Sequence, residues 1–330
     1  MCPPGVDQTM RTPQKWLLYA PELGQRHNSV LDRGGPRALL SEICPEREPL
    51  FDAWSLLARP ATYTVRLPSP KAYQSRGLFD KLSNELMDMI LEEVTDWNDP
   101  DDLMVLGLTC ESFWYLVSQH VHSAYLKCAA PWAGSKIIIQ GSYPTVLPGP
   151  LVDSPELKRA LGRSKYQQRP ARQLFWHGWQ FPLVAVMKMQ DGWRSAAERV
   201  KTISNLPESR WNEMQQQMSS AHLFPQDQTW LLRNLTAKRV VSSSQLLSTQ
   251  ASCDNTRDMG SVKESRFEDV LLMMTLWGYA PRGAKTDKTQ GPWAGHCFDI
   301  VTEDFHRIEG GDGWEDVTVK IFKDLVAWQL

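Results

Sequence analysis

Residues 82–94, with the sequence LSNELMDMILEEV, carry apolar positions at a spacing that predicts an α-helix. On such a helix Leu82, Leu86, Met89 and Ile90 gather on one side, and the whole apolar arc covers about 200°. A surface helix with one core-facing side needs only about half of that arc. The helix is therefore either sandwiched inside one domain, which is the commoner use of apolar stripes, or it contacts two partners.

Two further helical patterns follow at short intervals, over 100–108 and 110–121. Pro100 suits the first helical position, and Thr109 can cap the third helix. The short connections require the three helices to pack together, yet a unit of about 45 residues is rarely stable alone. We therefore expect its excess apolar surface to be buried against the rest of this chain or against a second protein.

The remaining chain alternates between short strand patterns and helical patterns, so the predicted fold class is α+β, with a small three-helix unit followed by a larger domain of helices and short strands. Runs of β-branched or alternating residues predict strands at 136–143, 182–189 and 297–304. Capping residues and apolar spacing predict helices at 154–162, 209–224, 227–241 and 263–280.

Segments rich in Pro, Gly, Ser and Arg predict where regular structure is sparse. Residues 1–76 are expected to be weakly ordered, except for one short amphipathic helix within 48–60. The Ser-rich stretch 242–261 is expected to be a flexible loop, and GGDG at 310–313 a turn. The predicted regions are therefore 1–76, a three-helix unit at 77–128, and a C-terminal domain at 129–330.

The word PWAG occurs at 131–134 and again at 292–295, and each copy precedes an apolar run. A repeat would indicate two related substructures, but a four-residue match also arises by chance in a chain of this length. The local interpretation is that Trp132 and Trp293 each bury a ring, and that the following Ala-Gly lets the backbone pass closely.

Composition narrows the class of protein. The 36 basic and 38 acidic residues give a formal net charge of −2, which offers no electrostatic case for binding nucleic acid or an anionic membrane. The six cysteines form no CxxC pair, and the N-terminus lacks the apolar stretch of a signal peptide. No apolar run reaches the length of a membrane span. We expect a cytoplasmic or nuclear protein.

The helical region carries a family resemblance. Leu82-Ser-Asn-Glu-Leu86, Ile90-Leu91, Asp102-Leu103, Leu106, Cys110, Phe113-Trp114 and Leu116 together resemble the F-box motif. The chain departs from that motif at Ser83, where the family normally has Pro, and in a longer first connection at 95–101. Ser83 can still cap the helix. Scattered blocks in 129–330 resemble the C-terminal regions of a large group of fungal F-box proteins, which have no generally assigned substrate.

The resemblance implies that the three helices dock on a Skp adaptor, which in turn binds a cullin. The chain would then be the non-enzymatic substrate receptor of an SCF-type ubiquitin ligase, with the C-terminal domain binding an unknown protein target. An alternative is a Skp-binding scaffold outside a ligase. The implied adaptor-binding residues are Leu82, Ser83, Leu86, Ile90, Leu103, Leu106, Cys110 and Trp114.

Motifs of catalysis and cofactor binding are missing from the sequence, which lacks HExxH, GxSxG, a Walker loop and a Cys/His quartet. We therefore predict no cofactor and no metal. The densest polar set is His296, Asp299, Glu303, Asp304 and His306, and in a strand the two histidines could share one face. An enzyme with its site there is the second alternative; solvated surface is the ordinary explanation.

Overall fold

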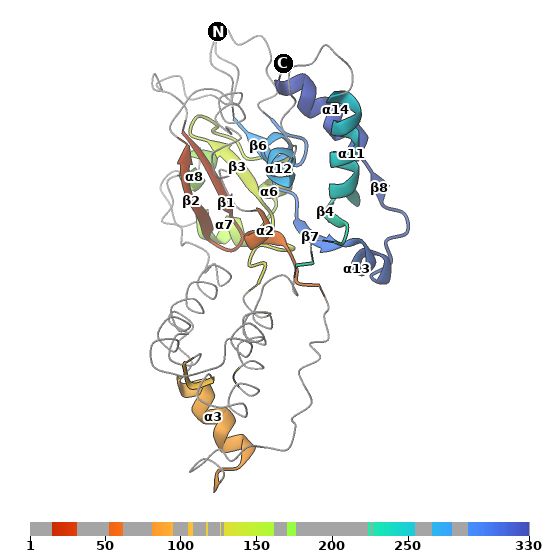
Figure 1. Ribbon diagram of the computed structural model, residues 1–330. Helices are drawn as coiled ribbons and strands as arrows, with labels where there is room; N and C mark the ends of the chain where they lie inside the picture. The colour runs from red at the N-terminus through yellow and green to blue at the C-terminus, as the bar shows by residue number, and fades with distance from the viewer. Residues whose placement is uncertain are drawn as a thin grey trace. The chain divides into compact units, whose positions relative to one another are not determined.

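The computed structural model describes residues 15–31, 53–61, 81–94, 105–107, 117, 126, 129–161, 170–175, 224–225, 227–254, 266–278 and 290–329 (Figure 1). The chain divides into two compact units, each assembled from separate stretches. The first unit, here called the body, comprises 1–59, 132–182 and 228–330; the second unit comprises 60–131 and 183–227. The units are therefore interleaved along the sequence and differ from the three consecutive regions that the sequence predicted.

One four-stranded sheet of the body has the order β2-β1-β3-β6. Strands β1 (Trp16–Ala20) and β2 (Gln25–Leu31) form a hairpin, and β3 (Ile138–Gly141) pairs antiparallel with β1. The short β6 (Leu276–Trp277) adds to β3 in parallel. The buried β1, with the sequence WLLYA, is apolar on both faces, as a strand covered on both sides must be.

The other four-stranded sheet has the order β7-β4-β5-β8. Strands β4 (Trp230–Asn234) and β5 (Arg239–Ser242) form a second hairpin, and β7 (Phe298–Thr302) pairs antiparallel with β4. The two-residue β8 (Glu315–Asp316) joins β5 in parallel. The fully buried strands β4 and β7 place the core of this sheet on the side away from β8.

Helices enclose the two sheets. Helices α6 (Gly149–Val152), α7 (Pro155–Leu161) and α8 (Pro170–Phe175) supply apolar side chains to the core around β1 and β3. Helix α12 (Phe267–Thr275) is buried along its whole length. Helices α11 (Ser243–Asp254) and α14 (Thr318–Gln329) lie side by side next to β5 (Figure 1). The body is thus α+β, as predicted.

Several predicted elements are confirmed within the described residues. Strands β3 and β7 lie inside the predicted strands 136–143 and 297–304, and α7 and α12 lie inside predicted helices. Both PWAG tryptophans are buried, and the glycine of each word has a positive φ, 82° at Gly134 and 78° at Gly295. The predicted strand at 182–189 and helix at 209–224 fall outside the described residues, as does most of 100–121.

The helix predicted over 227–241 is wrong, because these residues form the β4–β5 hairpin. The run WLLRNLTAKRVV has apolar pairs that fit a helix and a strand equally well, and its turn contains no Gly or Pro. The turn instead places Lys238 at φ 51°, in the left-handed region where glycine is the usual residue. The turn signal that the sequence does carry is Asn234, whose Oδ1 accepts from the Ala237 amide at 3.0 Å.

The flexible loop predicted over 242–261 is also wrong for its described part, which begins with the last residue of β5 and continues as helix α11. Ser242 supplies the cap, since its Oγ accepts a hydrogen bond from the amide of Gln245 at 3.5 Å. Leu246 is buried, and α11 packs on α14. Tertiary packing thus makes a helix of a Ser-rich sequence with weak amphipathic character. Residues 255–261 lie outside the described residues.

The N-terminal region also differs from its predicted weak order. Its residues 16–31 form the β1–β2 hairpin, and helix α2 (Ala53–Leu57) is buried, within the short helix predicted at 48–60. These residues complete the body rather than precede it. Among the described residues, no helix is both long enough and apolar enough to span a bilayer.

Candidate functional site

Helix α3 (Asn84–Val94) forms where the F-box resemblance begins. Ser83 is its N-cap: the Ser83 carbonyl accepts from the Met87 amide at 3.0 Å, and its Oγ accepts from the Leu86 amide at 3.4 Å. Hydrogen bonds from its own backbone amide and from the Ser83 hydroxyl lower the pKa of Glu85 in this first turn. Ser83 therefore starts the helix without the usual proline.

The apolar residues of α3 divide into two sides. Met87 and Leu91 are fully buried, at 0% exposure. Leu86 and Met89 are 48% and 64% exposed, among the most exposed large apolar side chains of the described residues. The helix therefore has one side for internal packing and another that presents apolar surface to solvent.

The predicted adaptor-binding residues are brought together only in part. Leu82 and Ile90, both half-buried, accompany the exposed Leu86 in or just before α3, with Ser83 at its start. Leu106 is half-buried in a helical stretch at 105–107. A Cβ added at the neighbouring Gly107 would lie 3.0 Å from Cβ of the buried Val117, so the second and third predicted helices approach closely there. Leu103, Cys110 and Trp114 lie outside the described residues.

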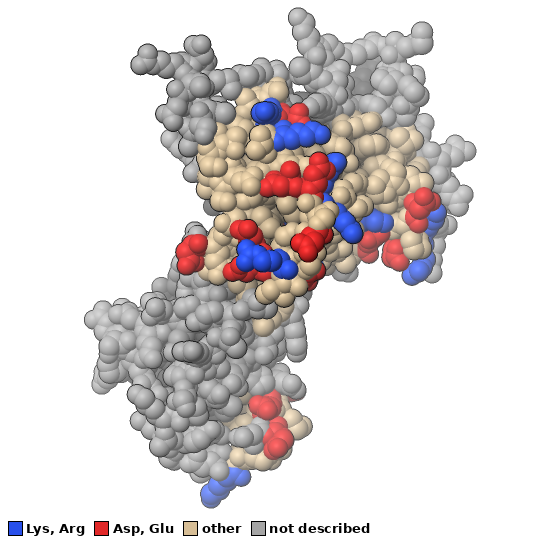
Figure 2. All heavy atoms as spheres, turned by 90° about the vertical axis from the view of Figure 1, so that its right-hand side faces the viewer, with Lys and Arg blue, Asp and Glu red and all other residues tan. Residues whose placement is uncertain are grey.

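On the face of the molecule that Figure 2 draws, neither sign of charge dominates the described surface. Figure 2 shows Lys and Arg interspersed with Asp and Glu over the face that carries α14, α11 and α13. Several of these charges form exposed ion pairs, such as Arg239 with Glu315 at 2.8 Å. Exposed pairs of this kind contribute little to stability, on the order of 0–1 kcal/mol.

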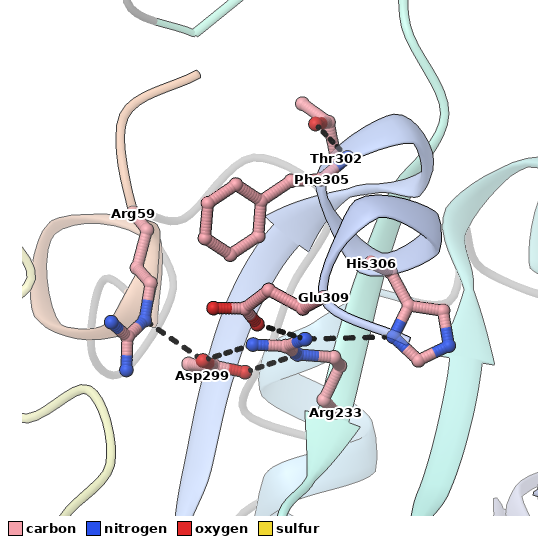
Figure 3. Close-up of polar contacts among 7 residues, drawn as sticks. All are labelled: Arg59, Arg233, Asp299, Thr302, Phe305, His306 and Glu309. Carbon is pink, nitrogen blue, oxygen red and sulfur yellow. Dashed lines mark hydrogen bonds and ion pairs between the residues drawn. The ribbon is translucent and has the colours of Figure 1, made fainter. Parts of the chain in front are cut away.

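A second candidate site is the buried ion cluster in the second sheet (Figure 3). Arg233 of β4 faces Asp299 of β7, its Cα partner in the sheet, and both side chains are almost fully buried. The guanidinium and the carboxylate form a bidentate pair, with Nε–Oδ1 at 2.8 Å and Nη2–Oδ2 at 2.7 Å. Arg59 also donates to Asp299 Oδ2, at 2.8 Å.

Helix α13 (Glu303–Ile308) attaches to this cluster through its C-terminal end. Arg233 Nη1 donates to Glu309 Oε2 at 2.8 Å and lies 3.5 Å from Nδ1 of His306 (Figure 3). The guanidinium carbon also stands 5.6 Å from the ring centre of Trp314, whose indole meets His306 edge to face. One arginine therefore connects two strands, a helix and the turn that follows it.

The electrostatics of the cluster favour fixed charges. Burial opposes the charge on Arg233, but hydrogen bonds and charges from Asp299 and Glu309 outweigh it and raise the pKa of the guanidinium. Burial, and then the charge of Arg233, lower the pKa of His306. A neutral His306 can offer Nδ1 as an acceptor toward Arg233. With each Arg233 nitrogen engaged in an ion pair, the arrangement can hold α13 in place.

The polar set proposed for the enzyme alternative does not converge on one point. Asp299 and His306 both contact Arg233, whereas His296 bonds the side chain of Asn234. Glu303 and Asp304 are exposed and pair with Arg307, also on α13. The prediction that both histidines share a strand face is wrong, because His306 lies in a helix. Within the described residues, no group of three or more His, Cys, Asp or Glu is placed to hold a metal ion.

Arg59, Arg233 and Glu309 are the members of the cluster that the sequence did not point to. Arg233 and Asp299 each interrupt an otherwise apolar run, WLLRN and FDIVT. A charge within a buried strand needs a partner, and that is the signal that would have paired them. No family model, curated protein or solved structure matches the chain. The F-box resemblance of residues 82–116 therefore rests on those residues.

Proposed function

We propose that the protein is a non-enzymatic substrate receptor of an SCF-type ubiquitin ligase. In this proposal the helical segment 77–128 docks on a Skp adaptor, and through it on a cullin, in the cytoplasm or nucleus. The body captures a protein target of unknown identity. The observation that carries the proposal is the exposed apolar side of α3, formed by Leu86, which the F-box resemblance assigns to the adaptor, and the adjoining Met89.

The exposure of α3 supports docking on physical grounds. Transfer of apolar surface from water to an interface is favourable by about 25 cal/mol per Å². Leu86 and Met89 keep much of their apolar surface in water although Met87 and Leu91 already supply a packed side. A partner that covers the exposed side, with Leu86 and Met89, would explain why the sequence has more apolar residues than internal packing uses. The resemblance names the adaptor as that partner.

The direct test is titration of the full-length protein with a purified Skp adaptor, with the dissociation constant measured by calorimetry. Leu86→Asp places a charge in the proposed interface, at a first-turn position where an acidic residue suits the helix N-terminus. By analogy with unpaired charges in desolvated contacts, we expect a loss of about 3–5 kcal/mol, or more than 100-fold in affinity. Met89→Asp should weaken binding in the same direction.

Leu247→Asp is the matched control. Leu247 is also a helical leucine and is 51% exposed, close to the 48% of Leu86, but it lies on α11. It should bind the adaptor like the wild type. Equal affinity of the wild type, Leu86→Asp and Met89→Asp would remove the proposal. Co-purification of a cullin with the adaptor complex then separates a ligase subunit from a scaffold that binds Skp alone.

A further inference from the structure

The two sheets of the body are built alike. Trp16 and Trp230 each open a central strand, and each is followed by two leucines. The central strand turns into a hairpin partner, β2 or β5, and pairs on its other edge with a strand that follows a PWAG word, β3 or β7. Residue numbers in the two hairpins differ by one constant, as between Trp16 and Trp230. Residue numbers in the two strands that follow PWAG, counted from Trp132 and Trp293, differ by a second constant. Residues related by these constants are called counterparts.

Under these constant offsets the central strand pairs with the PWAG strand in the same register in both halves. The hairpins agree at the turn end only, because a bulge between Leu17 and Tyr19 shifts the outer pairs of the first hairpin. In the first sheet the Cα partners are Trp16–Gly141, Leu17–Gln140, Leu18–Ile139 and Tyr19–Ile138. In the second they are Trp230–Thr302, Leu231–Val301, Leu232–Ile300 and Arg233–Asp299. The hairpin pair Ala20–Gln25 likewise corresponds to Asn234–Arg239. A shift of one residue would reverse every side chain, so agreement at each of these pairs is specific.

The hairpin turns also correspond. Gly24 and Lys238 occupy the same turn position, and both have a positive φ, 65° and 51°. In the first half Glu22 contacts the residue four after the PWAG tryptophan, Lys136, through an ion pair of 2.9 Å. In the second half Thr236, the counterpart of Glu22, accepts a hydrogen bond from the amide of Cys297, the counterpart of Lys136.

The helix before each PWAG word meets it in the same way. The Trp132 amide donates to the Leu56 carbonyl at the end of α2, at 2.9 Å. The Trp293 amide donates to the Met274 carbonyl near the end of α12, at 2.8 Å. Two residues further on, Ala58 bridges in parallel to Ile300, and Leu276 pairs in parallel with Ile139. Each half therefore extends the sheet of the other half.

The contacts between the halves are reciprocal. The Gly134 amide donates to the Phe298 carbonyl at 2.7 Å, and the Gly295 amide donates to the Ile137 carbonyl at 2.9 Å. Lys136 and Cys297, which are counterparts, bridge each other directly. Equivalent surfaces that contact each other in both directions are the signature of a two-fold relation. A chance recurrence of four letters does not produce such contacts.

We propose that the body is an internal duplication with pseudo-two-fold symmetry, and that the segment bearing α3 is an insertion into its first copy. In the first copy the chain leaves after Arg59 and returns at Trp132, beside Leu56. In the second copy the corresponding connection is only the short segment 278–289, between Trp277 and Gln290, which bridge each other. The target-binding body, a role that rests on the proposed function, therefore needs residues 16–59 as much as residues 228–330, while α3 belongs to a separate unit.

The test measures amide hydrogen exchange along the full-length chain in two matched variants, Leu18→Ala and Leu232→Ala. These residues are counterparts and are 5% and 0% exposed. In each variant, the backbone amides in the strands of both halves should exchange about 30-fold faster or more. This factor corresponds to the stability lost in a large-to-small core substitution. The strands concerned are 16–20, 138–141, 230–242 and 298–302. Helix α3 should keep its wild-type exchange, and adaptor binding measured in parallel should not change.

Two results would overturn the proposal. One is faster exchange confined to the half that carries the substitution, which would make the halves independent. The other is equally faster exchange in α3, which would make it part of the body. If the alanine variants do not fold, Ile139→Val and Ile300→Val should give the same pattern at about 2- to 10-fold. If neither the wild type nor any variant binds Skp, the proposed function is wrong, but the exchange pattern expected from the duplication is unchanged.

Discussion

The two sheets of the body carry chemically opposite residue pairs at one equivalent position. In the first half, Tyr19 and Ile138 are Cα partners in an apolar cluster. In the second half, the equivalent partners are Arg233 and Asp299, a buried ion pair. The backbone register is the same in both. Main-chain pairing and the surrounding core therefore define this fold, and the chemistry of a central pair can change within it.

The two halves satisfy the hydrogen-bonding groups of these central pairs differently. The Tyr19 hydroxyl donates to Gln140 Oε1, and the Gln140 amide donates to the carbonyl of Ala171 at 2.7 Å, so a neutral chain of hydrogen bonds crosses the first half. The second half uses Arg233 to reach Asp299 and Glu309. Buried ion pairs recover little more than their desolvation cost. We infer that the ion pair fixes the position of α13 rather than adding stability to the sheet.

The largest effect should come from breaking the ion pair. Asp299→Ala leaves Arg233, 4% exposed, with Glu309 as its remaining carboxylate partner in the cluster. An undercompensated buried charge should lower the free energy of unfolding by about 3–5 kcal/mol. Urea unfolding followed by tryptophan fluorescence measures this loss. A loss below about 1 kcal/mol would mean that the pair is solvated and that the contrast between the halves is superficial.

The first half should respond less strongly to loss of its own polar contact. Tyr19→Phe leaves Gln140 Oε1 without the hydroxyl donor and should cost about 1–3 kcal/mol in the same unfolding experiment. Burial raises the pKa of Tyr19 well above 10.0, so ionisation favours the unfolded state. Wild-type stability should therefore decline as the pH rises above about 10, more steeply than that of Tyr19→Phe. Parallel pH profiles would contradict the burial of the hydroxyl.

A double substitution tests whether the second half accepts the central residue pair of the first half. Arg233→Tyr with Asp299→Ile places the Tyr19–Ile138 pair of the first half at the equivalent position of the second, among the aromatic rings of Phe305 and Trp314. Both charges leave together, so no buried charge remains unpaired. We expect the loss of unfolding free energy to be less than half of that in Asp299→Ala, a coupling that a double-mutant cycle quantifies. Additive losses would show that the position tolerates only the ion pair.

The smallest effect should be the pH response of α13. Burial and Arg233 lower the pKa of His306 below 6.5, so the unfolded state binds the proton more readily as the pH falls. Stability should therefore decrease on acidification through pH 6.5, and the decrease should be smaller in His306→Asn. Because the pKa of His296 is also lowered, by burial and then by Arg239, His296→Asn is the comparison variant. An unchanged pH profile in His306→Asn would place His306 outside the cluster.

The sequence predicted the elements that carry their own local signals. The β-branched run at 137–139 and the partly alternating run at 297–304 indicated strands, and the Ser154 cap with an acidic first turn indicated α7. The second hairpin was misread because Lys238 occupies the turn position that Gly24 occupies in the first hairpin. Local patterns cannot show a turn whose strain is offset by strand pairing.

The two candidate sites also differ in how far local sequence signals predict them. The apolar side of α3 follows from helical spacing alone, so its residues could be predicted. The ion cluster combines Arg59, Arg233, Asp299 and Glu309, whose contacts depend on strand pairing and on how the chain returns after α13. Sequence spacing placed Asp299 and His306 in one polar set but could not bring Arg233 to them. The duplication was equally hidden, because few identical residues accompany the matching registers.

In the pseudo-two-fold body the two halves meet as equivalents at the bridge between Lys136 and Cys297, and Cys297 is a free thiol. Cα atoms of paired residues in antiparallel strands are about 4.5–5.5 Å apart, within the range of a disulfide. Lys136→Cys, oxidised and mapped by mass spectrometry without reduction, should therefore yield a disulfide between positions 136 and 297. A folded variant in which Cys297 stays free to alkylation under the same oxidation would contradict the pseudo-two-fold body.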